Sequence, residues 1–176
     1  MWQFILGRQL MTLRVFGPGS GQKILWLHGW MGNGGEGEGL QSQLGDNVQL
    51  ICPDLPGHGE RSLGETTLDD LLRDIAEMGE RCQAAAGYSM GGRLLMMAAA
   101  RFPLVFTDLV IESAHPGLES LKDRMNRREV DAARAQDLSD RGFSEFCRDW
   151  YATDMWADLN PTEKEGSHRD CAEALK

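Results

Sequence analysis

The feature that most limits how this chain can fold is a five-residue pattern, Gly-Tyr-Ser-Met-Gly, at residues 87–91. It lies between a stretch that predicts a strand, residues 82–87, and an apolar stretch that predicts a helix, residues 90–102. A serine at a sharp strand-to-helix turn is strained, and side chains on either side of it would clash, so glycines are needed there. A glycine-rich turn without chemistry fits the same five letters, but this context favours Ser89 as an exposed nucleophile.

Short apolar runs and helical patterns alternate along the first two thirds of the chain. Further strands are predicted at residues 10–16, 23–28, 48–52 and 107–112. A helix is predicted to begin after Thr66 or Thr67, because apolar residues recur at helical spacing as far as Met78. Strands that alternate with helices predict a mostly parallel sheet that binds ligands at the carboxyl ends of its strands.

Burial and loop structure are also suggested by the pattern. The stretch 90–102 is apolar almost all round, which predicts a buried helix, and residues 107–112 read as a buried strand. Residues 29–39 hold six glycines and predict a loop whose backbone N–H groups come close to a ligand.

The character of the chain changes after Pro116. Residues 118–138 and 144–150 are polar, rich in arginine and helical in pattern, and no further strand pattern follows. We therefore expect residues 1–115 to form the amino-terminal part of an α/β core and residues 116–176 to form a helical cap.

Composition excludes several classes of protein. The net charge of −9 and the pI near 4.9 argue against a nucleic-acid binder, since phosphate binding requires clustered positive charge. No apolar run approaches the roughly 18 residues that would cross a membrane, and the apolar first residues lack the basic start and cleavage site of a signal peptide. Met11 is an alternative start. The four cysteines have neither zinc nor dithiol spacing, which favours reduced thiols in the cytoplasm.

The sequence Leu-His-Gly-Trp at residues 27–30 closes the predicted strand 23–28, where hydrolases with a serine nucleophile place an oxyanion-hole donor. The N–H groups of Trp30 and Met90 are expected to point at one developing negative charge. We interpret His28 as a structural residue that is hydrogen-bonded to its loop. His58, in the turn at residues 53–59, is expected to be structural or to line a pocket.

Taken in this order, the three segments around Trp30, His58 and Ser89 resemble the α/β-hydrolase superfamily. A narrower resemblance rests on Gly-Tyr-Ser-Met-Gly-Gly-Arg at 87–93 and Glu-Ser-Ala-His-Pro-Gly-Leu at 112–118, with the arginines of 124–128 and Asp-Trp-Tyr at 149–151. These segments look like the 2-succinyl-6-hydroxy-2,4-cyclohexadiene-1-carboxylate synthase family of menaquinone biosynthesis. The similarity extends from about residue 11 to about residue 161.

The resemblance implies a lyase that eliminates pyruvate with a Ser-His-Asp triad and needs no cofactor and no metal. It implies a small substrate with several carboxylates, which guanidinium groups bind bidentately. Five residues match the substrate-binding positions of the family: Arg93, Arg124, Arg127, Trp150 and Tyr151. Trp150 also fits a second reading, as a core anchor of the cap. The other cap arginines, Arg128, Arg134 and Arg141, are expected to form a solvated helix face.

The chain departs from the family pattern after residue 156. In this fold the acid and the histidine follow the serine on loops behind later strands, and no such strands are evident. Glu112 is an alternative acid, His115 is too close to it in sequence to be its partner, and His168 is expected to be exposed. We therefore expect a chain truncated at its carboxyl end, with little lyase activity and an uncovered sheet edge at residues 107–111.

Two other functions remain open from the residues alone. One is a carboxylesterase or related hydrolase, and the other is a binding protein that has kept the pocket but not the triad. Arg93 and Arg127 separate the first from the lyase, because a neutral ester needs no arginine beside the nucleophile.

Overall fold

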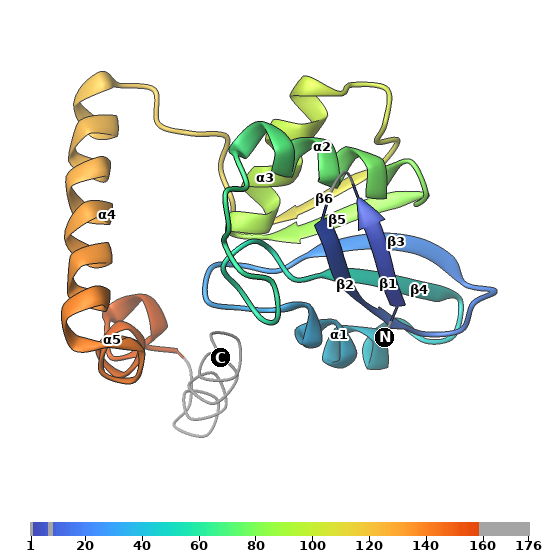
Figure 1. Cartoon of the computed structure of the whole chain (residues 1–176), viewed down its shortest axis with the longest axis horizontal. Helices are drawn as coiled ribbons and strands as arrows, with labels where there is room; N and C mark the ends of the chain where they lie inside the picture. Colours follow the sequence, from blue (N-terminus) through green and yellow to red (C-terminus); the bar gives the residue numbers. More distant parts are fainter. Residues whose placement is uncertain (1, 7–8, 159–176) are drawn as a thin grey trace. The chain divides into compact units, whose positions relative to one another are not determined.

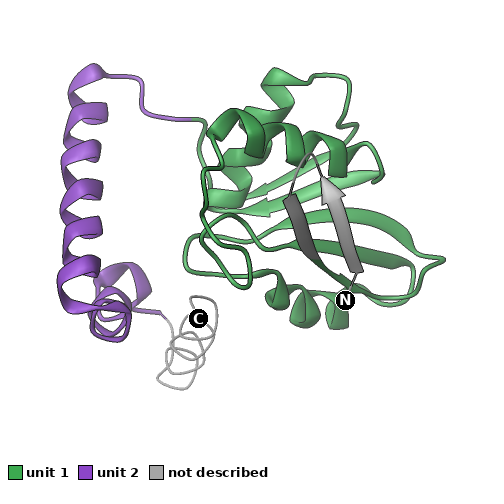
Figure 2. Ribbon diagram, viewed as in Figure 1, with its two compact units in different colours: residues 1–116, 174–176 green, residues 117–173 purple. Residues whose placement is uncertain are grey.

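The computed structural model describes residues 2–6 and 9–158. The chain divides into two compact units (Figure 2): in the described part, unit 1 holds residues up to 116 and unit 2 holds residues 117–158. Unit 1 contains strands β1 (Trp2–Leu6), β2 (Gln9–Phe16), β3 (Gln22–Leu27), β4 (Val48–Pro53), β5 (Ala84–Tyr88) and β6 (Leu109–Glu112). Its helices are η1 (Gly34–Glu36), α1 (Gly37–Leu44), α2 (Leu68–Gly79) and α3 (Met90–Arg101), and those of unit 2 are α4 (Leu121–Arg141), α5 (Phe143–Tyr151) and η2 (Asp154–Trp156).

The six strands form one sheet in the order β1-β2-β4-β3-β5-β6 (Figure 1). β4, β3, β5 and β6 run parallel to one another, whereas β2 runs antiparallel to both β1 and β4. The predicted fold class, an α/β architecture with a mostly parallel sheet, is therefore confirmed. The parallel arrangement brings the residues that follow β3, β4, β5 and β6 to one edge of the sheet.

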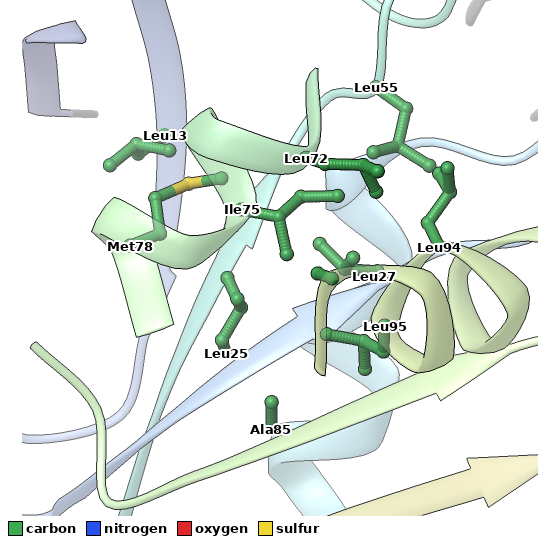
Figure 3. Close-up of a cluster of buried hydrophobic side chains, with 11 residues drawn as sticks. Leu13, Leu25, Leu27, Leu55, Leu72, Ile75, Met78, Ala85, Leu94 and Leu95 are labelled. Carbon is green, nitrogen blue, oxygen red and sulfur yellow. The ribbon is translucent and has the colours of Figure 1, made fainter. Parts of the chain in front are cut away.

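Helices cover both faces of this sheet, and the alternation of side chains along β3 decides which residue faces which layer. Leu25 and Leu27 point into a core shared with α2 and α3, which Figure 3 shows together with Ile75 and Leu95. Trp26, between them, faces the opposite side, where it joins a smaller cluster beneath α1. The unbroken apolar run from Ile24 to Leu27 is thus explained by burial on both faces.

Most of the predicted elements are present with shifts of one or two residues. The helix predicted after Thr67 is α2, and Thr67 closes a capping box in which its hydroxyl accepts a hydrogen bond from the Asp70 N–H. Some elements were missed, among them one strand and one α-helix. β1 was not predicted, and α1 begins inside the stretch 29–39 that we expected to be a loop, because glycine has low helix propensity and masks the helical pattern.

Two expectations of burial are wrong. Only one face of α3 is buried, and Met97 on the other face is 40% exposed. In β6 the side chain of Val110 is 63% exposed. The reason is position: β6 is the last strand of the described sheet and pairs only with β5, so it forms the uncovered apolar edge that the sequence also predicted.

Unit 2 contains the predicted helices α4 and α5, and its described residues include no strand. No residue of α4 is buried, whereas Phe146, Cys147 and Tyr151 of α5 are. An aromatic cluster joins α5 to η2: the Trp150 ring lies 6.3 Å from that of Phe146 and 6.4 Å from that of Trp156. Within residues 2–6 and 9–158 no helix combines the length and the apolar character that a membrane span requires.

Candidate active site

Ser89 occupies the turn between β5 and α3, as predicted. Its backbone is left-handed, with φ 49° and ψ −109°, a conformation that a non-glycine residue adopts only at a cost. Two backbone hydrogen bonds hold the turn: the Ser89 N–H donates to the Glu112 carbonyl at 2.9 Å, and the Arg93 N–H donates to the Ser89 carbonyl at 3.0 Å. Strain that is held in this way is typical of nucleophile turns.

The glycines around Ser89 are required by close packing. A β-carbon on Gly87 would lie 2.7 Å from the Gly91 carbonyl carbon, and one on Gly91 would lie 2.2 Å from the Leu27 carbonyl oxygen. The amino end of α3 therefore rests directly on the end of β3. A β-carbon on Gly29 would lie 3.5 Å from the Ser89 β-carbon, so the loop after β3 passes beside the serine.

That loop makes a tight turn just after His28. The Gly32 N–H donates to the Gly29 carbonyl at 3.2 Å, and Met31, the third residue of the turn, has a φ of 65°. A positive φ at this position is usually given to glycine, so Met31 is a second strained residue close to Ser89. Trp30 lies between them in the chain and is 39% exposed. The turn brings the predicted donor Trp30 into the neighbourhood of the serine.

His28 is completely buried, and both of its ring nitrogens are engaged with backbone. Nδ1 lies 2.7 Å from the Gly29 carbonyl oxygen, and Nε2 accepts a hydrogen bond from the Leu55 N–H at 3.0 Å. Because Nε2 is an acceptor, the proton is on Nδ1, which donates to Gly29. Burial lowers the pKa of His28 to about 4, so the ring is neutral at physiological pH. The structural interpretation of His28 is confirmed.

His58 packs on His28, with 5.2 Å between the ring centroids. Its Nδ1 lies 3.0 Å from the Pro56 carbonyl oxygen, and burial lowers its pKa below the usual value. The structural reading of His58 is thereby supported as well. The two histidines join the loops that follow β3 and β4.

Sequence reasoning missed Asp54, the first residue after β4. Its side chain is buried and accepts hydrogen bonds from the Gly34 N–H at 2.8 Å and the Glu60 N–H at 2.9 Å, and it forms an ion pair with Arg14. The available signal was an acidic residue directly after an apolar strand, because a carboxylate in that place is buried and needs partners.

Arg93 lies one turn into α3, on its exposed face. Its sequence neighbours are apolar, which led us to predict a substrate carboxylate as its partner, and this stays a prediction. Among the described residues Arg93 forms no ion pair. Its charge is therefore available one turn away from Ser89.

The other predicted binding residues belong to unit 2. Arg127 is exposed and its Nε donates to both carboxylate oxygens of Asp131 at 2.8 Å, and Arg124 is exposed on the same helix. Trp150 lies in the aromatic cluster, with the Arg134 guanidinium 4.9 Å from its ring centroid. Tyr151 is buried against Trp156 at 5.1 Å. Arg134 and Arg141 are thus tied into unit 2: Arg141 pairs with Asp137, Glu145 and Asp149.

A cavity of about 170 Å³ lies within unit 1 between the start of α2 and the start of α3. Met90, which follows the serine, forms part of its wall, together with Leu55, Leu71 and Leu94. Apart from Thr66 and Thr67 its lining side chains are apolar. A site of this kind suits an apolar group better than a carboxylate.

From the sequence, Glu112, His115 and His168 were also considered as the acid or the base that would act with Ser89. Glu112 ends β6 beside the serine turn and is exposed, as is His115. His168 lies outside the described residues. The bonds of the His28 and His58 rings go to backbone groups and not to the Ser89 hydroxyl.

Comparisons with known proteins agree with this geometry. A model of the alpha/beta hydrolase family matches residues 24–174. The 2-succinyl-6-hydroxy-2,4-cyclohexadiene-1-carboxylate synthase of Yersinia enterocolitica is 36% identical over 152 residues, which cover 83% of this chain and 55% of that protein. The corresponding protein of Citrobacter koseri is 34% identical, over 84% of this chain and 60% of that protein. The chain spans less than two thirds of the length of these curated relatives.

Solved structures show the same fold. The structure of MenH from S. aureus has a TM-score of 0.80 and 25% identity, covering 93% of this chain and 66% of that one. The esterase EaEST from Exiguobacterium antarcticum has a TM-score of 0.73 at 20% identity, covering 94% of this chain and 65% of that one. The family model extends over most of the chain and the strand-turn-helix geometry at Ser89 agrees with it, so the chain belongs to the alpha/beta hydrolase family.

Proposed function

We propose that the chain provides the nucleophile region and the cap of a lyase that forms 2-succinyl-6-hydroxy-2,4-cyclohexadiene-1-carboxylate in menaquinone biosynthesis. The observation that carries the proposal is the strained Ser89 turn packed against the loop after β3, in a chain whose curated relatives bear that synthase's name. Among the described residues Cys52, Cys82 and Cys147 form no disulfide bond, which agrees with a reducing compartment, and we assign the protein to the cytoplasm.

In the proposed reaction a base takes a proton from a ring carbon of the substrate. The electron pair of that C–H bond forms the new ring double bond, and the C–O bond to the three-carbon unit breaks with its electron pair on oxygen. The unit leaves as the enolate of pyruvate, which becomes pyruvate when its CH2 carbon takes up a proton. Ser89 acts at the reacting centre, and the N–H groups of Trp30 and Met90 stabilise the negative charge that develops on oxygen. One donor of this kind contributes about 3–4 kcal/mol to transition-state stabilisation in a serine hydrolase.

The substrate class follows from charge. Arg93 is exposed and has no ion pair among the described residues, although it lies one turn from the serine. In the proposal it binds a carboxylate of a small polycarboxylate substrate. Residues 116–176 act as a cap that supplies Arg124, Arg127, Trp150 and Tyr151, and Arg127 exchanges its bond to Asp131 for a second substrate carboxylate.

We further propose that the 176 residues alone release little pyruvate. Ser89 needs a base that accepts its proton. Both ring nitrogens of His28 are held by backbone groups, so His28 is not placed for this task. We expect His58, whose ring packs on His28, to remain structural. Binding of anions without turnover is the expected behaviour. The measurement is pyruvate release by the chain and by its Ser89→Ala form, and rapid release that is lost with the serine would overturn this part of the proposal.

The role of Arg93 is tested by binding of succinate, a simple dicarboxylate. We expect Arg93→Ala to weaken succinate binding by about tenfold, the effect of losing one charged hydrogen bond of about 1.4 kcal/mol. Arg101→Ala, at the far end of the same helix and also exposed, is the matched control and should leave binding unchanged. Equal effects of the two substitutions would mean that only general charge matters and that Arg93 has no specific role.

The apolar cavity beside Met90 favours a second candidate, a carboxylesterase that places the apolar part of an ester there. A substitution that fills this cavity distinguishes the esterase from the lyase, because only the ester is expected to enter it. Leu71→Trp should block a neutral ester such as a butyrate and spare succinate if the chain is an esterase. A binding protein without catalysis would bind succinate but would neither release pyruvate nor hydrolyse the ester, even in a chain that carries a complete triad.

A further inference from the structure

The loop after β3 is held at two points. Near its start, the ring of His28 bonds to the Gly29 carbonyl and to the Leu55 N–H. Five residues further on, the Gly34 N–H donates to the Asp54 carboxylate at 2.8 Å. Trp30 lies between these two points, so its amide can move only as far as they allow.

The Asp54 carboxylate is fixed by its buried hydrogen bonds and its ion pair. Its side chain is fully buried, Oδ1 accepts from Gly34, Oδ2 accepts from the Glu60 N–H at 2.9 Å, and Arg14 neutralises its charge. The backbone also closes around it: a β-carbon on Gly59 would lie 2.3 Å from Oδ2. Arg14 comes from β2, and thus one carboxylate connects β2 with the loops that follow β3 and β4.

A carboxylate is the group that this arrangement requires. Two backbone N–H groups from different loops converge on one side chain, and only a group with two acceptor oxygens satisfies both. An asparagine of the same shape has one oxygen and one NH2 group, which would face one of the two donors. A buried donor without an acceptor is costly, so the loop would have to shift.

We propose that Asp54 is a positioning residue that fixes the Trp30 amide against Ser89 by holding the loop at Gly34. This inference rests on the proposed role of the Trp30 and Met90 amides, which stabilise a negatively charged oxygen in the reaction and are expected to bind a carboxylate oxygen of succinate in the same way. Asp54 touches neither the anion nor the serine and acts through the backbone of residues 30–34. A displacement of such a donor by about 1 Å is enough to lose much of its effect.

The test is a succinate titration of the ¹⁵N-labelled 176-residue chain, followed by the amide signals of Trp30 and Met90. In the wild-type chain both signals are expected to shift on binding. In Asp54→Asn we expect the Trp30 response to be lost and the affinity to fall about tenfold, as for one lost hydrogen bond. Asp54→Asn with wild-type affinity and a wild-type Trp30 response would overturn the positioning role.

The matched control is Asp74→Asn, which breaks the partly buried ion pair between Arg61 and Asp74. Asp74 accepts from Arg61 at 2.7 Å and ties the loop after β4 to α2, with no bond to residues 29–34. It should lower the urea midpoint about as much as Asp54→Asn and leave succinate affinity within about twofold of wild type. If both variants weaken binding in proportion to their loss of stability, Asp54 is merely structural.

A second measurement needs no substitution. If an ordered loop is required for binding, succinate must in turn stabilise the Gly34–Asp54 bond, because linkage is reciprocal. Hydrogen exchange of the Gly34 amide should slow about tenfold at a succinate concentration ten times its Kd. Unchanged Gly34 exchange in a chain that binds succinate overturns the positioning role alone. Absence of any Trp30 or Met90 response in the wild type removes the anion site itself, and with it both proposals.

Discussion

The amide nitrogen of Ser89 donates a 2.9 Å hydrogen bond to the carbonyl oxygen of Glu112, the last residue of β6. The strained serine turn is therefore held from outside by the strand at the edge of the described sheet. The segment after β6 also packs closely on the first turn of α3, since a β-carbon on Gly92 would lie only 3.0 Å from the Ala114 β-carbon. The geometry of the site thus depends on how well β6 is kept in place.

The exposed apolar edge at Val110 should make the 176-residue chain self-associate. Unpaired edge strands with apolar side chains are templates for pairing with other chains. We expect Val110→Lys to reduce association, measured as concentration-dependent light scattering, because a charged edge opposes pairing. Leu104→Lys adds the same charge at a side chain that is 99% exposed and lies outside the sheet. If the two substitutions reduce scattering equally, net charge and not the β6 edge is responsible.

Two glycine substitutions should have opposite effects on stability. Gly91→Ala puts a β-carbon 2.2 Å from the Leu27 carbonyl oxygen, so we expect a loss of about 1–3 kcal/mol or more in the free energy of unfolding. Gly39→Ala, in α1, meets nothing within 4 Å and should add about 0.5–1 kcal/mol through helix propensity. Urea unfolding measures both. A harmless Gly91→Ala would show that α3 does not rest on the end of β3 as described.

The buried His28 predicts a dependence of stability on pH. Burial is the main cause that lowers its pKa from 6.5 to about 4, so the unfolded chain binds the proton more readily than the folded chain does. The contribution is complete above pH 6.5 and is lost as the pH falls toward 4, to a total on the order of 3 kcal/mol.

The pH dependence is measured as the free energy of unfolding between pH 7 and pH 5. His28→Gln should flatten the slope in this range, even though it lowers stability overall. A slope that His28→Gln does not change would assign the proton uptake to another group, such as His58.

In unit 2 the contact between Arg134 and Trp150 should be measurable. The guanidinium lies 4.9 Å from the ring centroid, and a cation–π contact at a partly exposed site is worth about 0.5–1 kcal/mol. We expect Arg134→Gln to destabilise unit 2 by that amount, followed by near-ultraviolet circular dichroism of the aromatic cluster. Arg128→Gln, on the same helix and exposed, should have an effect within about 0.5 kcal/mol of zero. Equal effects of the two substitutions would show that the charge on the helix matters and that the contact with Trp150 adds nothing to stability.

Patterns that reflect a single element were predicted well from the sequence. β3, β4 and α2 were predicted within one or two residues, since burial on two faces and a capped amphipathic helix both leave a local periodicity. α1 and the exposure of Met97 were not predicted. Glycines hide the first, and the second depends on what covers α3, which no local pattern records.

The position of Ser89 was determined by the sequence alone, because two glycines around a serine between a strand and a helix permit only one tight turn. The roles of Asp54, Arg14 and His28 were decided by tertiary structure. Arg14 and Asp54 are 40 residues apart, and their ion pair exists only because β2 and β4 are neighbours in the sheet. A hydrogen bond or ion pair between distant residues depends on which strands pair, and pairing is a property of the whole sheet and not of either segment.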